Sequence, residues 1–497
     1  QFSKQDLKVD FIIPPKSHLP PTLKGIESLV ISRLNDLDVS HMIRRPDHLS
    51  TADHSRLNAL GLRPFEVRTV RDDAEISQQV LSGLVLHRPG GATAISRVDD
   101  KTSDHLEFLL ATAAQRLSTG KTPHIALISE PPRLSPAEAF EYHQKQLSPP
   151  KGADVFSELK TLLHTYGYRV TYINPGTPHL PPDTNLMIWM QPRRDASKIT
   201  ALLSQHLARG GNAIVAMQHY NIQQRQYRGG SFETVYWPQP QYQDLNQYLE
   251  PLGIKQVREI LMDQTRSRLA LETQIYRRAV REYEAQEVAL PFLIRTVGPN
   301  FETNSPITRQ LGDQLFIWGN RFTPISDSLH AHNLTTSSLI TTSDRAWAYN
   351  WSGGWLPESA FAPDSLILSK QPLAILVNGT FPTAEFRPNE TGETERTLQH
   401  PTPNPPGQLL LIGSSEMFKN TYLYTPGFQH EQFLLNAVAY LTHGPEYSEL
   451  QARRKIARGF PYLPPDLKTL WRILVVGIGP ICITLYGLIR YLRARKI

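Results

Sequence analysis

The chain of 497 residues is too long for one compact core, and a composition of 40% hydrophobic and 20% charged residues is typical of folded domains. The net charge of +6 does not indicate nucleic-acid binding, because the segment from Leu450 onward holds ten Lys and Arg residues against the single acid Asp466. The body before it is therefore slightly acidic. The one cysteine, Cys482, excludes an intrachain disulfide, a cysteine-ligated zinc site and a soluble thiol nucleophile.

The first predicted region, residues 1–118, mixes strands and helices. Apolar residues at helical spacing alternate with short apolar runs, and the turn Arg88-Pro-Gly-Gly91 joins two of these runs as a hairpin. We expect an α/β domain with a strand at 7–13, helices at 23–37, 52–62 and 104–117, and a hairpin of strands at 83–87 and 92–96.

The second region, residues 119–288, shows the clearest pattern. Its strands are apolar along their whole length and alternate with helices, which predicts a parallel sheet covered on both faces, in a flavodoxin-like order. A polar, aromatic stretch near 220–243 is expected to be an extended surface loop. The predicted strands are 124–129, 168–173, 186–190 and 213–217, with helices at 137–147, 154–166 and 196–209.

Residues 289–450 have a more β-rich texture, with strands expected at 366–368, 373–377 and 409–412 and a closing helix at 432–442. The segment 451–469 that follows is a basic juxtamembrane linker. The chain begins with Gln1 rather than Met, from which we expect a processed or truncated N-terminus with a signal peptide or an earlier membrane segment missing.

The C-terminal segment 470–492 is predicted to be a transmembrane helix. It contains no charge between Arg472 and Arg490, carries Trp471 at one edge, and is expected to kink at Pro480. The alternative is a buried core helix. The tail 493–497 should be cytoplasmic by the positive-inside rule, although the basic linker on the other flank weakens this orientation; the anchoring cations are Arg490, Arg493, Arg495 and Lys496.

A ligand of the second region would bind outside the carboxyl ends of its strands, where open α/β sheets form a crevice. The alternative is that the residues at these positions are ordinary loop residues. The candidates for a ligand or partner crevice are Ser129, Glu130, Gln191, Gln218 and His219.

Four further patterns lack the surroundings that their chemistry needs. Gly120-Lys-Thr122 has Gln115 where a phosphate-binding loop requires glycine, and it follows a helix rather than a strand. His330-Ala-His332 has no spaced third ligand, so a solvated loop is the better interpretation, and we expect no metal. Trp347, Trp351 and Trp355 could line a carbohydrate or peptide groove, but core packing is the better default. Gly413-Ser-Ser-Glu416 could offer backbone N–H groups to an anion, but no triad can be argued there, and we assign no catalytic residue.

The order of several motifs resembles the GldG-like auxiliary proteins of ABC transporters, which are named after a gliding-motility component. The final membrane helix, with its Gly-Pro pair and Arg-rich end, belongs to the resemblance. The sequence motifs that carry it are 185–192, 207–215, 333–343, 372–382, 409–420 and 433–441.

The resemblance implies a non-enzymatic extracytoplasmic subunit that works with an ABC-2 type permease and a separate ABC ATPase, without a cofactor. It implies a bacterial inner-membrane protein whose bulk is periplasmic, with a thioredoxin-like first domain and a middle domain similar to amidotransferase-like α/β domains. The membrane helix could pack against permease helices through Gly477, Gly479, Pro480 and Gly487.

Two other functions stay open from the residues. One is a membrane-tethered hydrolase or carbohydrate-binding protein that uses the strand-end crevice or the tryptophan region. The other is a eukaryotic single-pass glycoprotein receptor, which the Asn-X-Ser/Thr sequences favour and the absence of disulfides disfavours.

Overall fold

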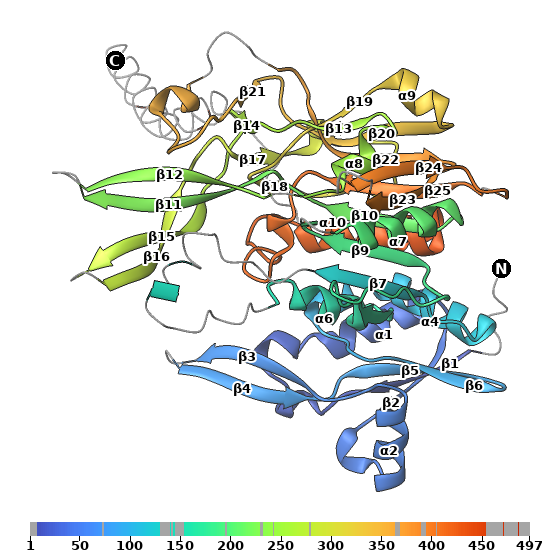
Figure 1. Ribbon diagram of the computed structural model, residues 1–497. Helices are drawn as coiled ribbons and strands as arrows, with labels where there is room; N and C mark the ends of the chain where they lie inside the picture. The colour runs from blue at the N-terminus through green and yellow to red at the C-terminus, as the bar shows by residue number, and fades with distance from the viewer. Residues whose placement is uncertain are drawn as a thin grey trace, which may run out of the picture. The chain divides into compact units, whose positions relative to one another are not determined.

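The computed structural model shows a mixed α/β protein with several sheets (Figure 1), as the sequence predicts. Residues 1–453 form one compact unit, and the predicted boundaries after 118 and 288 fall inside it. Residues 454–497 form the second unit. The structure describes residues 7–453 and, beyond them, Trp471 and Tyr486, with the exception of 72–73, 130–139, 141–142, 145–153, 194–195, 229–231, 242, 278–279, 363–367, 389–393 and 404.

The N-terminal region folds around a four-stranded sheet in the order β2-β1-β5-β6. β1 and β2 are parallel, while β5 runs antiparallel to β1 and pairs with β6 as the predicted hairpin. The predicted helices are confirmed, whereas β2 and the β3–β4 hairpin were not predicted. The elements are β1 (Lys8–Ile12), α1 (Ile26–Asp36), β2 (Ser40–Arg44), α2 (Thr51–Ala59), β3 (Phe65–Arg71), β4 (Ala74–Val80), β5 (Gly83–Arg88), β6 (Gly91–Ile95), α3 (Asp100–Ser103) and α4 (Leu106–Thr119).

A seven-stranded central sheet has the order β20-β22-β25-β10-β9-β7-β8. Its five parallel strands follow the 2-1-3-4-5 order of doubly wound sheets, which confirms the parallel pattern expected from the sequence. β22 and β20 extend it in antiparallel orientation. The strands are β7 (His124–Ser129), β8 (Arg169–Tyr172), β9 (Leu186–Met190), β10 (Asn212–Ala216), β20 (Leu334–Thr341), β22 (Pro372–Gly379) and β25 (Gly407–Ile412).

Both faces of the central sheet are buried, because alternate side chains of each strand enter two different cores. Ile188 of β9 belongs to the core that contains α6 and α10, whereas Trp189 belongs to the opposite core with α7. Double burial explains why these strands read as continuous apolar runs. The helix expected at 137–147 lies almost entirely outside the described residues. The helices are α6 (Ser157–Thr165), α7 (Ser197–Ala208), α10 (His430–His443) and α11 (Pro445–Ala452).

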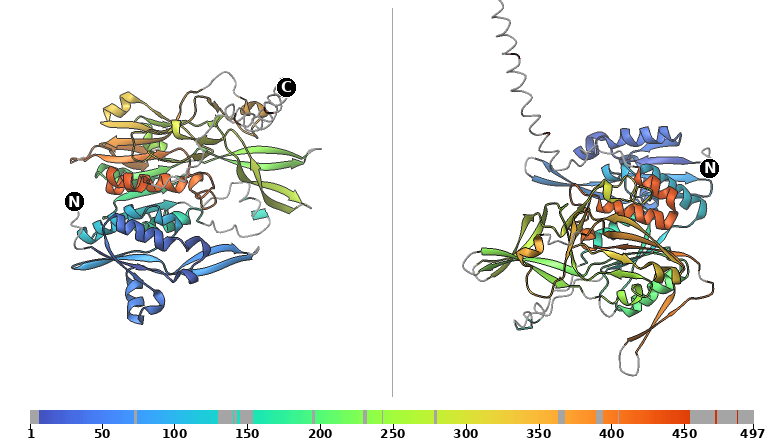
Figure 2. Two further views of the ribbon diagram at one scale, coloured as in Figure 1. Left: turned by 180° about the vertical axis from the view of Figure 1, so that it is seen from behind. Right: turned by 90° about the horizontal axis from the view of Figure 1, so that it is seen from above.

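The stretch near 220–243 is a β-hairpin, so the expectation of a surface loop was wrong. β11 and β12 pair over their full nine residues and join β15 and β16 in the sheet β12-β11-β15-β16, whose hairpins project to one side of the unit (Figure 2). The polar composition of this segment does not show the apolar alternation typical of strands, although Tyr220 and Ile222 at the start of β11 pack in a core. The strands are β11 (Tyr220–Arg228), β12 (Phe232–Pro240), β15 (Leu269–Arg277) and β16 (Val280–Val288).

Short strand pairs connect these hairpins to the central sheet. A third core, formed by residues such as Phe292, Leu315 and Trp347, lies beneath them. The remaining elements are α8 (Asn246–Leu249), β13 (Ile254–Gln256), β14 (Ile260–Asp263), β17 (Leu293–Thr296), β18 (Gln314–Ile317), β19 (Phe322–Pro324), α9 (Ser326–Ala331), β21 (Ala346–Tyr349), β23 (Thr383–Pro388) and β24 (Thr394–Gln399).

Arg116 of α4 links the N-terminal sheet to the central sheet. Its guanidinium donates to the carbonyl oxygen of Gly167 at 2.9 Å and to that of Ala94 in β6 at 3.2 Å. Burial lowers the pKa of Arg116, and both partners are backbone carbonyls rather than a carboxylate. The side chain therefore acts as a charged hydrogen-bond donor between two parts of the chain.

Arg116→Met is expected to lower the free energy of unfolding by about 2 kcal/mol, because it removes two charge-assisted hydrogen bonds of a half-buried group while keeping the apolar stem. Urea denaturation of the variant measures the loss. The matched control is the same substitution at the exposed Arg63. Equal stability of the two variants would contradict this role.

The predicted transmembrane helix at 470–492 lies outside the described residues except for Trp471 and Tyr486. The same is true of its glycines Gly477, Gly479 and Gly487, of Pro480, and of the cationic end with Arg490, Arg493, Arg495 and Lys496. Within the part of the chain that the structure describes, no helix has the length and apolar character needed to cross a bilayer.

Candidate functional site

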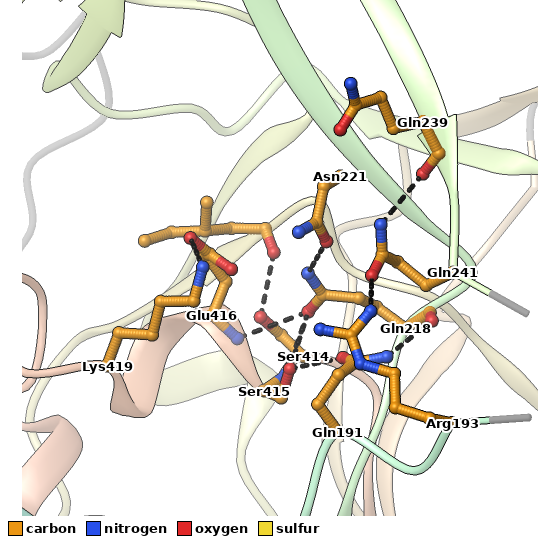
Figure 3. A network of polar contacts seen from close by, with 11 residues as sticks. Gln191, Arg193, Gln218, Asn221, Gln239, Gln241, Ser414, Ser415, Glu416 and Lys419 are labelled. Carbon is orange, nitrogen blue, oxygen red and sulfur yellow. Dashed lines mark hydrogen bonds and ion pairs between the residues drawn. The ribbon is translucent and has the colours of Figure 1, made fainter. Parts of the chain in front are cut away.

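The carboxyl edge of the central sheet brings together three of the predicted crevice residues, Gln191, Gln218 and His219, of which Figure 3 shows the first two. Gln191 follows β9, while Gln218 and His219 follow β10, and all three side chains are buried. Because β9 and β10 are parallel neighbours in register, their carboxyl ends lie side by side. Glu130 lies outside the described residues.

Gln218 is the centre of a buried hydrogen-bond network. Its Oε1 accepts from the backbone N–H groups of Ser415, at 2.9 Å, and Glu416, at 3.2 Å. Its Nε2 donates to Asn221 Oδ1 at 2.6 Å. The segment Gly413–Glu416, considered above as an anion loop, therefore gives its N–H groups to a side chain of the protein itself.

Gln191 completes this network from the neighbouring strand. Ser415 Oγ donates to Gln191 Oε1, and Gln191 Nε2 donates to the carbonyl oxygen of Gln218 at 3.4 Å. Gln191 has a φ of 50°, in the left-handed region that a residue other than glycine adopts at a cost in free energy. The hydrogen bonds of its side chain hold it in this conformation.

His219 is not placed to act as a base toward Ser415. Its backbone N–H donates to Asn320 Oδ1 at 2.7 Å, and its Nε2 lies 3.2 Å from the carbonyl oxygen of Gln256, to which the neutral ring can donate. Burial lowers the pKa of His219 to about 4, so the ring is neutral at physiological pH. Its described contacts tie β10 to the segment that carries β13.

Ser129 lies at the end of β7, the strand next to β9, where it is in register with Met190, but its hydrogen bonds go to other partners than Gln191 and Gln218. Its Oγ donates to Asp154 Oδ1 at 3.0 Å and also contacts the hydroxyl of Tyr172, which donates to the Ser129 carbonyl oxygen at 2.7 Å. Asp154 in turn accepts from the backbone N–H of Phe156 just before α6. The hydroxyl of Ser129 thus stabilises the position of Asp154, which precedes α6.

Asn320 belongs to the same edge but is not one of the predicted crevice residues. Its backbone N–H donates to the Gly413 carbonyl oxygen at 2.7 Å, and its side-chain Nδ2 donates to the Glu259 carbonyl oxygen at 3.0 Å. Gly413 is required here, because a Cβ atom would lie 2.0 Å from the Asn320 carbonyl oxygen. In the sequence, the glycine between Trp318 and Asn320 indicates a turn at this position.

The carboxyl edge is therefore filled by amide and hydroxyl groups that bond to one another and to the backbone. Further polar residues join this edge: Arg193 donates to Gln241 Oε1, and Ser414 Oγ donates to the Ile317 carbonyl oxygen at 2.8 Å. Satisfied buried polar groups of this kind fix one packing arrangement. The arrangement can hold the β11–β12 hairpin and the segments around β13 and β18 on the sheet.

Two cavities, of about 520 and 740 Å³, lie at the opposite, amino edge of the sheet. Lys121 and Arg209, which line them, stand at the ends of α4 and α7, where cations offset the partial negative charge of a helix C-terminus. None of the described crevice candidates lines either cavity. The residues common to both are Pro182, Thr184, Asn185 and Thr442.

The other sequence patterns have structural roles where they are described. Gly120 is the left-handed C-cap of α4, not part of a phosphate loop. Trp347 is buried in a core and Trp351 packs against it, as the default interpretation expected, whereas Trp355 is 54% exposed. His332 faces His400, with the ring nitrogens 3.1 Å apart. Among the described residues, no group of three or more metal-ligating side chains is found.

Comparisons with known proteins point to transport. Residues 122–437, more than half of the chain, match a protein family described as an ABC-type uncharacterized transport system. No curated protein matches the chain significantly. Among solved structures, the chain is similar to a ThuA-like protein from Bacteroides uniformis, with 10% sequence identity, a TM-score of 0.30, and an alignment over 65% of this chain and 92% of that one. So low a TM-score carries no argument about function.

Proposed function

Because this chain belongs to the ABC-type uncharacterized transport system family, we propose that it is a non-catalytic auxiliary subunit of such a system. The observation that carries the proposal is the extent of the family match. Residues 122–437 include all seven strands of the central sheet, together with the projecting hairpins and the network at the carboxyl edge.

The partners proposed for this subunit are an ABC-2 type permease and a separate ATPase. The Gly120-Lys-Thr122 segment caps a helix and does not form a phosphate-binding loop, which supports assigning nucleotide hydrolysis to another chain. The motif order that resembles GldG-like proteins supports the permease as the membrane partner. The most specific version of this proposal is a role in gliding motility.

The proposed anchor is the C-terminal segment 470–492, which would hold the body at a bacterial inner membrane on the periplasmic side. Its uncharged run and the cations Arg490, Arg493, Arg495 and Lys496 support this orientation. Packing against permease helices would use the small residues Gly477, Gly479 and Gly487 beside the kink at Pro480. The domain boundaries predicted from sequence, including a thioredoxin-like first domain, are part of the same proposal.

A non-catalytic role also agrees with the chemistry of the carboxyl edge. The side chains of Gln218 and Gln191 form hydrogen bonds with Ser415 and with neighbouring backbone groups, so both side chains stabilise the fold. The buried His219 contacts Asn320 and Gln256. We therefore prefer a structural role for the predicted crevice over the hydrolase or carbohydrate-binding alternative.

The test is capture of the full chain from its native membranes in mild detergent, followed by mass spectrometry. We expect an ABC permease and an ABC ATPase to be recovered together with the chain. Recovery of the chain alone, with hydrolytic activity of its own, would contradict the proposal.

A further inference from the structure

β20 forms an edge of the central sheet with an unusual composition. From Leu334 to Thr341 it contains no charged residue and no proline, and Thr335, Ser337 and Ser338 are exposed. Natural edge strands are normally protected by charges, prolines or a covering segment, because their unpaired N–H and C=O groups can pair with another strand.

The other edges of the described sheets with more than two strands do carry such protection. β8, at the far edge of the central sheet, has only four residues and includes Arg169, while β2 includes Arg44. β6 is uncharged, but Arg116 donates to its Ala94 carbonyl oxygen. β12 contains Pro238 and Pro240, and β16 contains Arg281 and three Glu residues. This contrast singles out β20.

Among the described residues, backbone pairing on the outer side of β20 is found only along its second half. Phe301 forms an isolated bridge with Ile340, and the Glu302 backbone N–H donates to the Leu339 carbonyl oxygen at 2.9 Å. The register with β22 also shifts between Ser338 and Thr341, which distorts this half. The first half, Leu334–Ser338, pairs regularly with β22 and has no strand on its outer side among the described residues.

We propose that this half-strand is a docking edge for β20 of a second copy of the chain. The two strands would form an antiparallel pair, related by a two-fold axis that passes at one of the residues from Thr335 to Ser338. A neutral strand can pair with its own copy without opposing like charges, and Thr and Ser side chains form favourable cross-strand pairs. A charged segment of a different protein would find no opposite charge on these residues. The chemistry therefore favours self-pairing.

Surface next to β20 can enlarge this interface beyond the strand ladder, which alone is smaller than the roughly 1,200 Å² of a stable interface. α9 packs against β20, and Ile325, which precedes α9, is 44% exposed. Across a two-fold axis, α9 of each copy would approach the neighbouring sheet edge. An exposed apolar side chain at that position fits a protein contact.

Disulfide trapping tests the pairing in the full chain. In a Cys482→Ser background, single cysteines replace Thr335, Thr336, Ser337 or Ser338 in native membranes, and a mild oxidant is added. In an antiparallel pair only the residue on the axis faces its own copy, with Cα atoms about 4.5–5.5 Å apart, which suits a disulfide. We expect a covalent dimer at one of the four positions.

The control is Ser118→Cys, an exposed serine on α4. If none of the four positions exceeds this control, or if all four cross-link equally, the proposed pairing is wrong. A second measurement uses the purified full chain without added cysteines. Ser337→Lys is expected to convert its dimer to monomer in mass photometry, while Ser118→Lys leaves the dimer intact and circular dichroism confirms that both variants fold. A monomeric native chain, or a Ser337→Lys variant that stays dimeric, would overturn the inference.

Discussion

Gln218→Leu is expected to lower the free energy of unfolding by about 3–5 kcal/mol, because it leaves two buried backbone N–H groups without their acceptor and Asn221 Oδ1 without its donor. Leucine has a similar size, so the loss comes from hydrogen bonding and not from a cavity. The N–H groups of Ser415 and Glu416 both point at Gln218 Oε1, and the side chain of Gln218 is fully buried. Urea denaturation followed by circular dichroism measures the change.

The matched control is Gln79→Leu, because Gln79 is exposed at the end of β4 and the change there should stay within about 0.5 kcal/mol. If Gln218→Leu is as stable as this control, the carboxyl edge does not depend on the network. A ligand site at the edge would then become the better interpretation.

Acidification from pH 6.5 to pH 4 is expected to destabilise the body strongly, because burial lowers the pKa of three histidines, His219, His430 and His443, to about 4. In the unfolded chain each ring binds a proton near pH 6.5, whereas in the native state it binds one only near pH 4. Between these values the unfolded chain binds more protons, so stability falls as the pH falls. Each ring contributes roughly 3 kcal/mol to this loss.

His430 shows the structural reason most clearly. Its Nδ1 donates to the Tyr422 carbonyl oxygen at 2.8 Å, and its Nε2 accepts from the Leu315 backbone N–H at 3.1 Å. This pair of contacts requires the neutral ring, because a proton on Nε2 would face the N–H of Leu315. His430→Gln should therefore reduce the slope of stability against pH between 6.5 and 4.

The measurement is a series of urea denaturations across this pH range, and the control is His48→Gln at an exposed ring. The variants are compared by the slope of stability against pH, because His430→Gln also lowers the stability at neutral pH. A native chain whose stability is constant from pH 6.5 to 4 would contradict the neutral burial of these rings.

The sequence was sufficient for six of the seven strands of the central sheet, because strands buried on both faces are apolar throughout, whereas β20, which has exposed Thr and Ser residues, was not predicted. Residues 186–190 and 213–217 were recognised in this way and form β9 and β10, each with a one-residue difference at most in its bounds. The same reasoning failed for β11, in which Gln, Arg and Tyr predominate, and for β12, which contains two prolines and no regular apolar alternation. Apolar periodicity detects strands that bury an apolar face, and polar residues such as the buried Gln224 do not produce that pattern.

The site was predictable only in part. The rule that ligands bind at the carboxyl ends of strands placed Gln191 and Gln218 at one edge, and the structure brings them together. The rule could not show that Ser415, 197 positions after Gln218, would occupy their hydrogen-bonding groups. Nor could it find Asn320, whose partners come from three separate segments. Such pairings join residues that are far apart in the sequence, which local patterns do not encode.

The most direct test of the transport role is reciprocal capture from native membranes. The ABC ATPase recovered with this chain is tagged in turn, and the full chain is compared with a version that ends at Arg453. We expect the tagged ATPase to recover the full chain and the permease together, and removal of the C-terminal segment to lower recovery of the chain. Capture of the permease without any of the full chain would contradict the assignment as an auxiliary subunit.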